Sequence, residues 1–140
     1  MTAVREARPD ERATVANVLD GAALAVDHET LPARIGAGDV LIAHEGGRLL
    51  GALVLDSESD SGSGTGSTTR RIDAIAVRRR RRGQGIGSAL VAAALERCDR
   101  LVAEFDGAEL PFYERRGFAL EPVGDDRYRG VCRAGEGRPP

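Results

Sequence analysis

The segment "VRRRRRGQGIGSAL", residues 77–90, decides how the rest of the sequence is interpreted. Five arginines, Arg78–Arg82, precede glycines at positions 83, 85 and 87, and an apolar run of helical period follows. Arg71–Val77, directly before the arginines, alternates like a strand. A strand, a glycine-rich turn and a helix start predict an anion site, because the first N–H groups of a helix lack internal acceptors.

Other interpretations of this segment are weaker. The dinucleotide fingerprint GxGxxG needs a glycine at position 88, where this sequence has Ser88, and its first glycine should directly follow the strand. A P-loop is excluded because GxxxxGK[ST] requires a lysine, and the sequence has none. Arg78–Arg82 form a positive patch, so a nucleic-acid-binding module stays an alternative, although the net charge is −2 and no aromatic residue adjoins the patch.

Three segments together resemble one enzyme family, the GNAT family of N-acetyltransferases. "RRGQGIGSAL" fits motif A of that family, [Q/R]-x-x-G-x-[G/A], with Arg82, Gly85 and Gly87 at its defining positions. "PFYERRGF", residues 111–118, is similar to the family's segment near the C-terminus, and "VREARPDERATVANVL" is similar to its opening strand and helix. The resemblance covers residues 2–133.

The resemblance implies an α/β (α+β) fold, with a central mixed, mostly antiparallel sheet, splayed middle strands and helices on both faces. It implies acetyl-CoA as co-substrate, with the pyrophosphate held at the turn and the pantetheine arm along the preceding strand. The residues implied for these contacts are Ile75, Ala76, Val77, Arg82, Gly83, Gln84, Gly85, Ile86, Gly87 and Ser88.

The chemistry of acetyl transfer to an amine needs a proton acceptor for the amine, and it gains from a donor to the departing thiolate. Tyr113 is the candidate acid, because a phenol pKa near 10 is not far above that of a thiol. Asp73 is the candidate base, and an ion-paired structural role for it is an equal alternative. Histone-acetylating members of the family have a Glu about where this sequence has Arg71, so the identity of the base stays open. Glu104, on the neighbouring strand, is a second candidate base. Asp106 stands where many members have Asn, which puts that pantetheine contact in doubt.

Length and composition predict a single globular domain over residues 1–133, with a flexible Gly/Ser loop at 57–69 and a disordered tail at 134–140. Cys98 and Cys132 are expected as buried apolar side chains, not as a disulfide. No signal peptide, membrane span or metal site is predicted, and the cytoplasm is the expected location. All twenty basic residues are arginine, which leaves a salt-adapted host open.

The order of elements predicted from the sequence is β-α-α-β-β-β-α-β-α-β-β. The expected partner is a small-molecule or peptide amine, with no membrane and with nucleic acid disfavoured; a homodimer is left open. A catalytically silent acyl-CoA sensor is a further alternative to the enzyme. The expected elements are strands at 2–8, 40–44, 49–55, 71–77, 101–105, 118–123 and 128–133, and helices at 9–25, 31–35, 85–98 and before Gly117.

Overall fold

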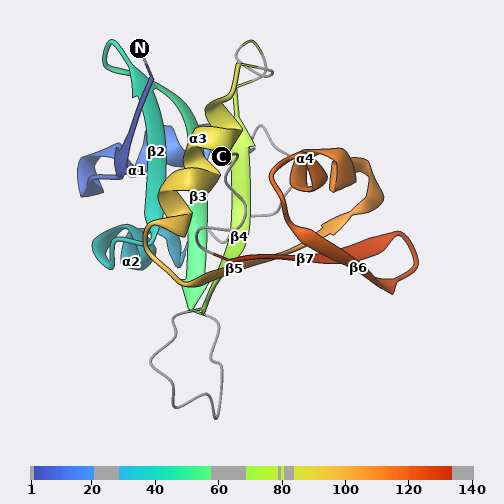
Figure 1. Cartoon of the computed structure of the whole chain (residues 1–140). Helices are drawn as coiled ribbons and strands as arrows, with labels where there is room; N and C mark the ends of the chain where they lie inside the picture. Colours follow the sequence, from blue (N-terminus) through green and yellow to red (C-terminus); the bar gives the residue numbers. More distant parts are fainter. Residues whose placement is uncertain (1, 21–28, 58–68, 79, 81–83, 134–140) are drawn as a thin grey trace. The chain divides into compact units, whose positions relative to one another are not determined.

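The computed structural model describes residues 2–20, 29–57, 69–78, 80 and 84–133 (Figure 1). Contacts divide the chain into two compact units, one of residues 1–56 and 73–94 and one of residues 57–72 and 95–140. The prediction of a single domain over residues 1–133 stays a prediction. Among the described residues, no helix is long and apolar enough to cross a bilayer.

The first unit contains the N-terminal strands and helices and the segment that leads into the glycine-rich turn. Its elements are β1 (Ala3–Glu6), η1 (Pro9–Glu11), α1 (Arg12–Asp20), α2 (Leu31–Gly36), β2 (Val40–Glu45), β3 (Arg48–Ser57), most of β4 (Thr69–Val77) and nearly all of α3 (Ile86–Leu95). The second unit contains the start of β4, then β5 (Arg100–Asp106), η3 (Gly107–Glu109), α4 (Leu110–Arg115), β6 (Ala119–Gly124) and β7 (Arg127–Arg133).

The seven strands follow the order β1-β2-β3-β4-β5-β7-β6, and the sheet is mixed and mostly antiparallel, as expected. The β1–β2, β2–β3, β5–β7 and β6–β7 pairs are antiparallel. The parallel ladder between β4 and β5 joins Thr69–Ile72 to Arg100–Ala103 and ends there in the part of the chain that is described.

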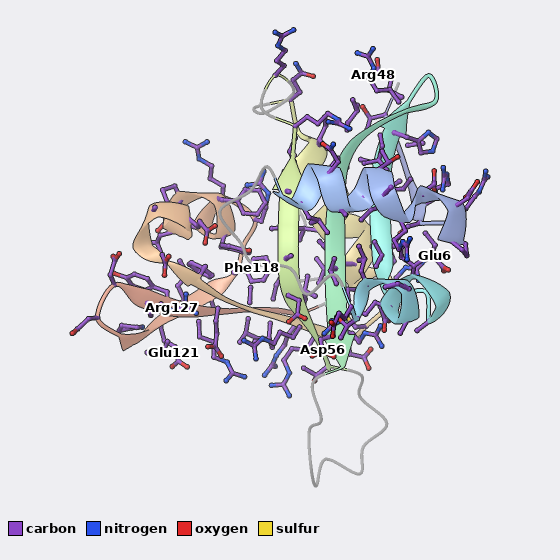
Figure 2. The ribbon with its side chains drawn as sticks, turned by 180° about the vertical axis from the view of Figure 1, so that it is seen from behind. Glu6, Arg48, Asp56, Phe118, Glu121 and Arg127 are labelled. Atoms are coloured by element: carbon purple, nitrogen blue, oxygen red, sulfur yellow. The ribbon has the colours of Figure 1, made fainter. Side chains whose placement is uncertain are left out.

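Helices cover both faces of the strands in the first unit, because β2, β3 and β4 alternate two apolar faces. Figure 1 shows α3 in front of β3, and Figure 2, drawn from behind, shows α1 in front. α1 and α2 pack against one face, whose strand residues in the core cluster are Val40, Ile42, Leu49, Ala52, Val54, Ala74 and Ala76. α3 packs against the opposite face next to Gly51, where a Cβ would lie 3.2 Å from Ile86 Cγ2.

The strand and helix boundaries differ from the expected ones by a few residues. The loop expected at 57–69 is shorter at both ends, because Ser57 still belongs to β3 and Thr69 already belongs to β4. The helix expected over 85–98 ends at Leu95, and Cys98 is buried beyond it. The first helix begins as a 3-10 turn at Pro9, and its expected end at residue 25 lies outside the described residues, as do most of the loop and the tail at 134–140.

An ion pair anchors the start of the first helix to the first strand. Both terminal nitrogens of Arg5 donate to the carboxylate of Glu11, at 2.8 and 2.7 Å. Glu11 also accepts a hydrogen bond of 2.8 Å from the Arg8 backbone N–H, which lies before the first turn. The hydrogen bonds from Arg5 are the main reason why the pKa of Glu11 falls from 4.5 to about 2.

We expect Glu11→Gln to lower the free energy of unfolding by about 1 kcal/mol at neutral pH, since the pair is only partly exposed. The pKa of Glu11 is depressed in the folded protein, so this stability is fully present above pH 4.5 and is lost as the pH falls toward 2. Urea denaturation of both proteins across this range measures the difference. Glu114→Gln at an exposed carboxylate is the control, and a difference between wild type and Glu11→Gln that persists below the pKa would contradict the assignment.

Candidate functional site

Arg78 fixes the end of β4 against β3. Its backbone N–H donates to the carbonyl oxygen of Leu50 at 2.8 Å, and its Nε donates to the carbonyl oxygen of Leu49 at 2.7 Å. The first arginine of the run is therefore bound to the sheet, whereas Arg80 is exposed. Of the other predicted contact residues, Arg82 and Gly83 lie outside the described residues, together with Arg79 and Arg81.

Gly85 forms the junction between the turn and α3. Its φ is +83°, a left-handed conformation that side chains other than glycine rarely adopt. Its carbonyl accepts the hydrogen bond from Ala89 N, at 3.0 Å, and this begins the helix. A Cβ built on Gly85 would have no heavy atom within 4 Å, so the space beside the helix start is open.

The start of α3 suits a strongly anionic group. The N–H groups of its first turn have no acceptors within the helix and carry the positive end of the helix dipole. No acidic side chain lies in that turn. Ile86 and Gly87 are buried, while Gln84, Gly85 and Ser88 are exposed, so the turn is accessible from the Gln84–Gly85 side. These residues fit a diphosphate.

Close packing of α3 on β3 determines where this helix starts. A Cβ on Gly51 would lie 3.0 Å from the Ala76 carbonyl oxygen, 3.2 Å from Ile86 Cγ2 and 3.3 Å from Leu90 Cδ1. The sequence analysis did not single out Gly51, although a glycine inside a strand is itself a signal of close approach by another segment.

The backbone of β4 presents one edge that is not used by β3. Because Arg78 N–H bonds to β3, the alternation of an antiparallel ladder points the backbone groups of Ala76 toward β3 and those of Ile75 and Val77 the other way. The described β4–β5 pairs end at Ile72. The Ala76 side chain therefore belongs to the core and its backbone groups face β3. The backbone groups of Ile75 and Val77 face the opposite edge of the strand.

Asp73, the predicted base, forms an ion pair with a residue that the sequence did not single out. Its carboxylate lies 2.7 Å from Arg34 Nη1 of α2, and Arg34 also donates to the Leu55 carbonyl oxygen at 3.0 Å and lies 3.7 Å from Asp56. The partner, Arg34, lies far from Asp73 in the sequence. The Asp73 side chain is 34% exposed, so it is accessible but already bound to a cation.

Tyr113, the predicted acid, lies in an aromatic cluster of the second unit. Its ring stacks on Phe105 with centroids 4.1 Å apart and meets Phe112 and Phe118 edge-on at 5.0 and 5.2 Å. The residue is only 4% exposed. Figure 2 shows Phe118 on the side of the β6–β7 hairpin where α4 lies, and Glu121 on the opposite side of the hairpin.

This burial changes the acidity expected of Tyr113. Desolvation raises the pKa of the phenol well above its usual 10, the charge of Glu109 adds to the shift, and that of Arg116 opposes it. The phenol is therefore protonated at neutral pH, as a proton donor must be. It is, however, a weaker acid than the value near 10 assumed from the sequence, because the phenolate is poorly solvated in the cluster.

Two charged residues near Tyr113 in the sequence are bound within the second unit. Arg116 lies 3.7 Å from the centroid of the Phe112 ring and donates to the Phe112 carbonyl oxygen at 2.7 Å, which holds it against α4. Asp106 accepts a hydrogen bond of 2.9 Å from Arg127 of β7. Glu104, the second candidate base, lies opposite Arg129 in the β5–β7 ladder.

Among the described residues, no group of three His, Cys, Asp or Glu could hold a metal ion.

Solved structures with the same fold include three acetyl-transferring proteins or their relatives. N-acetylglutamate synthase of Neisseria gonorrhoeae, complexed with coenzyme A and N-acetyl-glutamate, has a TM-score of 0.78 at 18% identity, covering 96% of this chain and 35% of its own. Ard1 of Thermoplasma volcanium has a TM-score of 0.77 at 20% identity, covering 95% and 97%. The polyamine N-acetyltransferase of Drosophila melanogaster has a TM-score of 0.72 at 13% identity, covering 95% and 100%.

The chain thus spans about a third of the Neisseria enzyme, and at these identities the likeness establishes the fold alone. No curated protein matches the chain. The family model described as "Acetyltransferase (GNAT) domain" matches residues 36–120, which include β2 to α4 and the glycine-rich turn. Since this match covers more than half of the sequence, the protein belongs to the GNAT acetyltransferase family.

Proposed function

We propose that this protein is an N-acetyltransferase that uses acetyl-CoA and acetylates a primary amine by direct attack. The observation that carries the proposal is the start of α3, where Gly85 has a positive φ, the space beside it is open and no acidic residue lies in the first turn. Family membership supports the same reaction class. Acetyl-CoA, when bound, supplies the activated acetyl group, and the protein supplies binding, orientation and proton transfer.

The proposed binding residues form two groups of the first unit, supplemented by two residues outside the described range. Of the three predicted residues at the end of β4, Ile75 and Val77 offer strand backbone for the pantetheine arm, whereas the backbone groups of Ala76 face β3. Gln84 to Ser88 offer the helix start for the diphosphate, with Arg82 and Gly83 assigned by the family resemblance only. This arrangement uses backbone N–H groups and the helix dipole, so it binds a diphosphate with few charged side chains.

Tyr113 is the proposed donor to the departing thiolate. Its raised pKa keeps the phenol protonated at neutral pH but makes it a weaker acid toward the departing thiolate, so a packing role for Tyr113 is the direct rival. Asp73 is the proposed acceptor of the amine proton. Its ion pair with Arg34 holds the carboxylate in place, but it also competes with proton transfer, so a structural role is the direct rival.

The amine acceptor is proposed only as a class, a small molecule or a peptide. The Neisseria synthase was solved with N-acetyl-glutamate and the Drosophila protein is named for polyamines, and at their low identity neither substrate transfers to this chain. A silent acyl-CoA sensor would bind acetyl-CoA and release no thiol with any amine. A nucleic-acid-binding module would instead show steep salt dependence with DNA or RNA.

We expect acetyl-CoA to raise the melting temperature of the wild-type protein, because a ligand that binds only the folded state stabilises it. Gly85→Val should weaken acetyl-CoA binding at least tenfold, since a side chain at this left-handed position strains the turn and fills the open space beside the helix start. Thermal-shift titrations of both proteins measure this. Ala92→Val, at an exposed position of the same helix, is the matched control and should bind normally; no stabilisation of the wild type would reject the proposed site.

We expect Tyr113→Phe to lower kcat by roughly 100-fold or more, as for loss of a general acid, with acetyl-CoA affinity nearly unchanged. The measurement is thiol release with a panel of amines, followed by acetyl-CoA titration. The chain has only two tyrosines, so Tyr128→Phe is the matched control and should keep kcat. An equal and small effect of both substitutions would leave Tyr113 as a core residue only.

Asp73→Asn separates the two roles of that carboxylate. If Asp73 accepts the amine proton, the variant loses the acidic limb of the pH–rate profile for kcat/KM while Arg34→Gln, which removes the ion pair, retains activity. If the ion pair is structural, both variants lose similar stability and keep the wild-type profile. Profiles of all three proteins, with urea denaturation, decide between these roles, and an unchanged profile in Asp73→Asn rejects the base.

A further inference from the structure

The turn between β6 and β7 contains an unusual backbone conformation. Asp126 has a φ of +57°, and among the residues that the structure describes it is the only one other than glycine with a positive φ. Asp125 and Asp126 connect the end of β6 to the start of β7, and both are exposed. A side chain makes this left-handed conformation unfavourable, although aspartate tolerates it better than most residues. Such strain persists only where the surrounding structure holds it.

The contact that holds Asp126 is with the first residue of η3. The Asp126 carbonyl oxygen accepts a hydrogen bond of 3.0 Å from the backbone N–H of Gly107. A Cβ built on Gly107 would overlap Oδ1 of Asp126 and would lie 3.5 Å from Cε2 of Tyr128. The missing side chain of Gly107 therefore lets the turn approach η3 closely.

This hydrogen bond continues the pairing of β5 with β7 beyond the end of β5. The last ladder pair is Asp106 with Arg127, and Arg127 Nη1 donates to the Asp106 carboxylate at 2.9 Å. Gly107 and Asp126 are the next residues on the two segments. The ion pair between Asp106 and Arg127 is exposed and contributes little, so the backbone hydrogen bond is the main contact between η3 and the turn.

Gly107 transmits the position of the turn to α4 through its two backbone groups. Its N–H is bound to Asp126, and its carbonyl oxygen accepts a hydrogen bond from the N–H of Leu110, the first residue of α4. Tyr113 lies three residues after Leu110, which is about one turn of helix. Figure 1 shows α4 beside the β6–β7 hairpin. A shift of the turn would therefore move the start of α4 and, with it, Tyr113.

The aromatic rings connect the same two segments a second time. Tyr128, two residues after Asp126, stacks on Phe105 with ring centroids 6.3 Å apart, and Phe105 stacks on Tyr113 at 4.1 Å. Burial is the main cause of the raised pKa of Tyr113, and the charge of Glu109, the last residue of η3, adds to it. The position of η3 thus affects both the packing of the Tyr113 ring and the charge near its phenol.

We propose that Asp126 is a positioning residue for Tyr113, because its carbonyl oxygen holds Gly107 and thereby fixes the start of α4. The inference rests on the proposed role of Tyr113 as donor to the departing thiolate. Asp126 acts through its backbone, so its carboxylate is dispensable as long as the residue can adopt a positive φ. All the residues of this connection belong to the second unit.

The first test removes the N–H of Gly107. Proline suits the first position of a helix, so Gly107→Pro removes the donor to Asp126 and keeps the local conformation. We expect kcat to fall by about tenfold or more with acetyl-CoA affinity unchanged, since a small displacement of a catalytic group has effects of this size. Gly107→Ala is the matched control, because it adds a Cβ at the same place but keeps the N–H, and the exposed Asp126 carboxylate can turn away. Equal kcat in Gly107→Pro and Gly107→Ala overturns the proposal.

The second test changes the conformation of the turn. Valine does not tolerate a positive φ, so Asp126→Val displaces the carbonyl oxygen, whereas glycine and asparagine keep the conformation. We expect Asp126→Val to lower kcat as Gly107→Pro does, and Asp126→Gly and Asp126→Asn to retain the wild-type kcat. A loss in Asp126→Gly as large as in Asp126→Val assigns the effect to the carboxylate and rejects the backbone role. A lower melting temperature in Asp126→Val with unchanged kcat, measured well below that temperature, also rejects positioning.

A readout without turnover distinguishes this proposal from the proposed enzyme function. The chain has two tyrosines and no tryptophan, so in a Tyr128→Phe background the fluorescence comes from Tyr113. We expect Asp126→Val to increase acrylamide quenching of Tyr113 in this background, and Asp126→Gly to leave it unchanged. If the wild type releases no thiol with any amine and quenching changes as expected, the enzyme function is rejected and the turn still positions the ring. If the wild type is active and Asp126→Val changes neither kcat nor quenching, the positioning role is rejected and the enzyme function stands.

Discussion

The two hydrogen bonds from Arg78 to β3 are the constraint on which the candidate site depends. They fix the residue at which β4 leaves the sheet, and they set which backbone groups of the strand face β3 and which face the other edge. The turn that follows must reach α3, whose start is held by contact with Gly51. A strand end and a helix start that are both fixed leave the first-turn N–H groups in a defined position. Such preorganisation is what a backbone-built anion site requires, because backbone groups cannot move individually to meet a ligand.

The second unit illustrates how one side chain serves both packing and chemistry. Tyr113 lies among three phenylalanines, and its aromatic contacts stabilise the junction of α4 with β5 and with the residue that precedes β6. The same contacts remove water from the phenol and raise its pKa. Arg116, stacked on Phe112, is the nearby positive charge that opposes this shift. Acid strength at this position is therefore set by the packing of α4, and changes to the cluster would alter both stability and proton donation.

The element order and the glycine turn could be predicted from the sequence because both depend on local pattern. Continuous apolar runs mark β2 and β3, alternation marks β4, and "EGG" places two glycines with positive φ, Gly46 and Gly47, at the tight hairpin turn. Helix ends were less predictable, since α3 stops at Leu95 although the apolar period continues to Cys98. The partner of Asp73 could not be predicted either. Arg34 is far from it in sequence, and only the folding of α2 beside β3 and β4 brings the two charges together.

The sequence by itself determined that a strand, a glycine-rich turn and a helix follow one another, because glycine spacing and hydrophobic period act over a few residues. It also determined the family, through motifs that are contiguous in the chain. Only the tertiary structure decided what the charged residues do. Arg78 is bound to β3, Asp73 is paired with Arg34, and Arg133 meets Arg100 across a ladder whose register no local pattern specifies. The physical reason is that charges act at short range through space, and strand pairing, not sequence distance, sets which charges are neighbours.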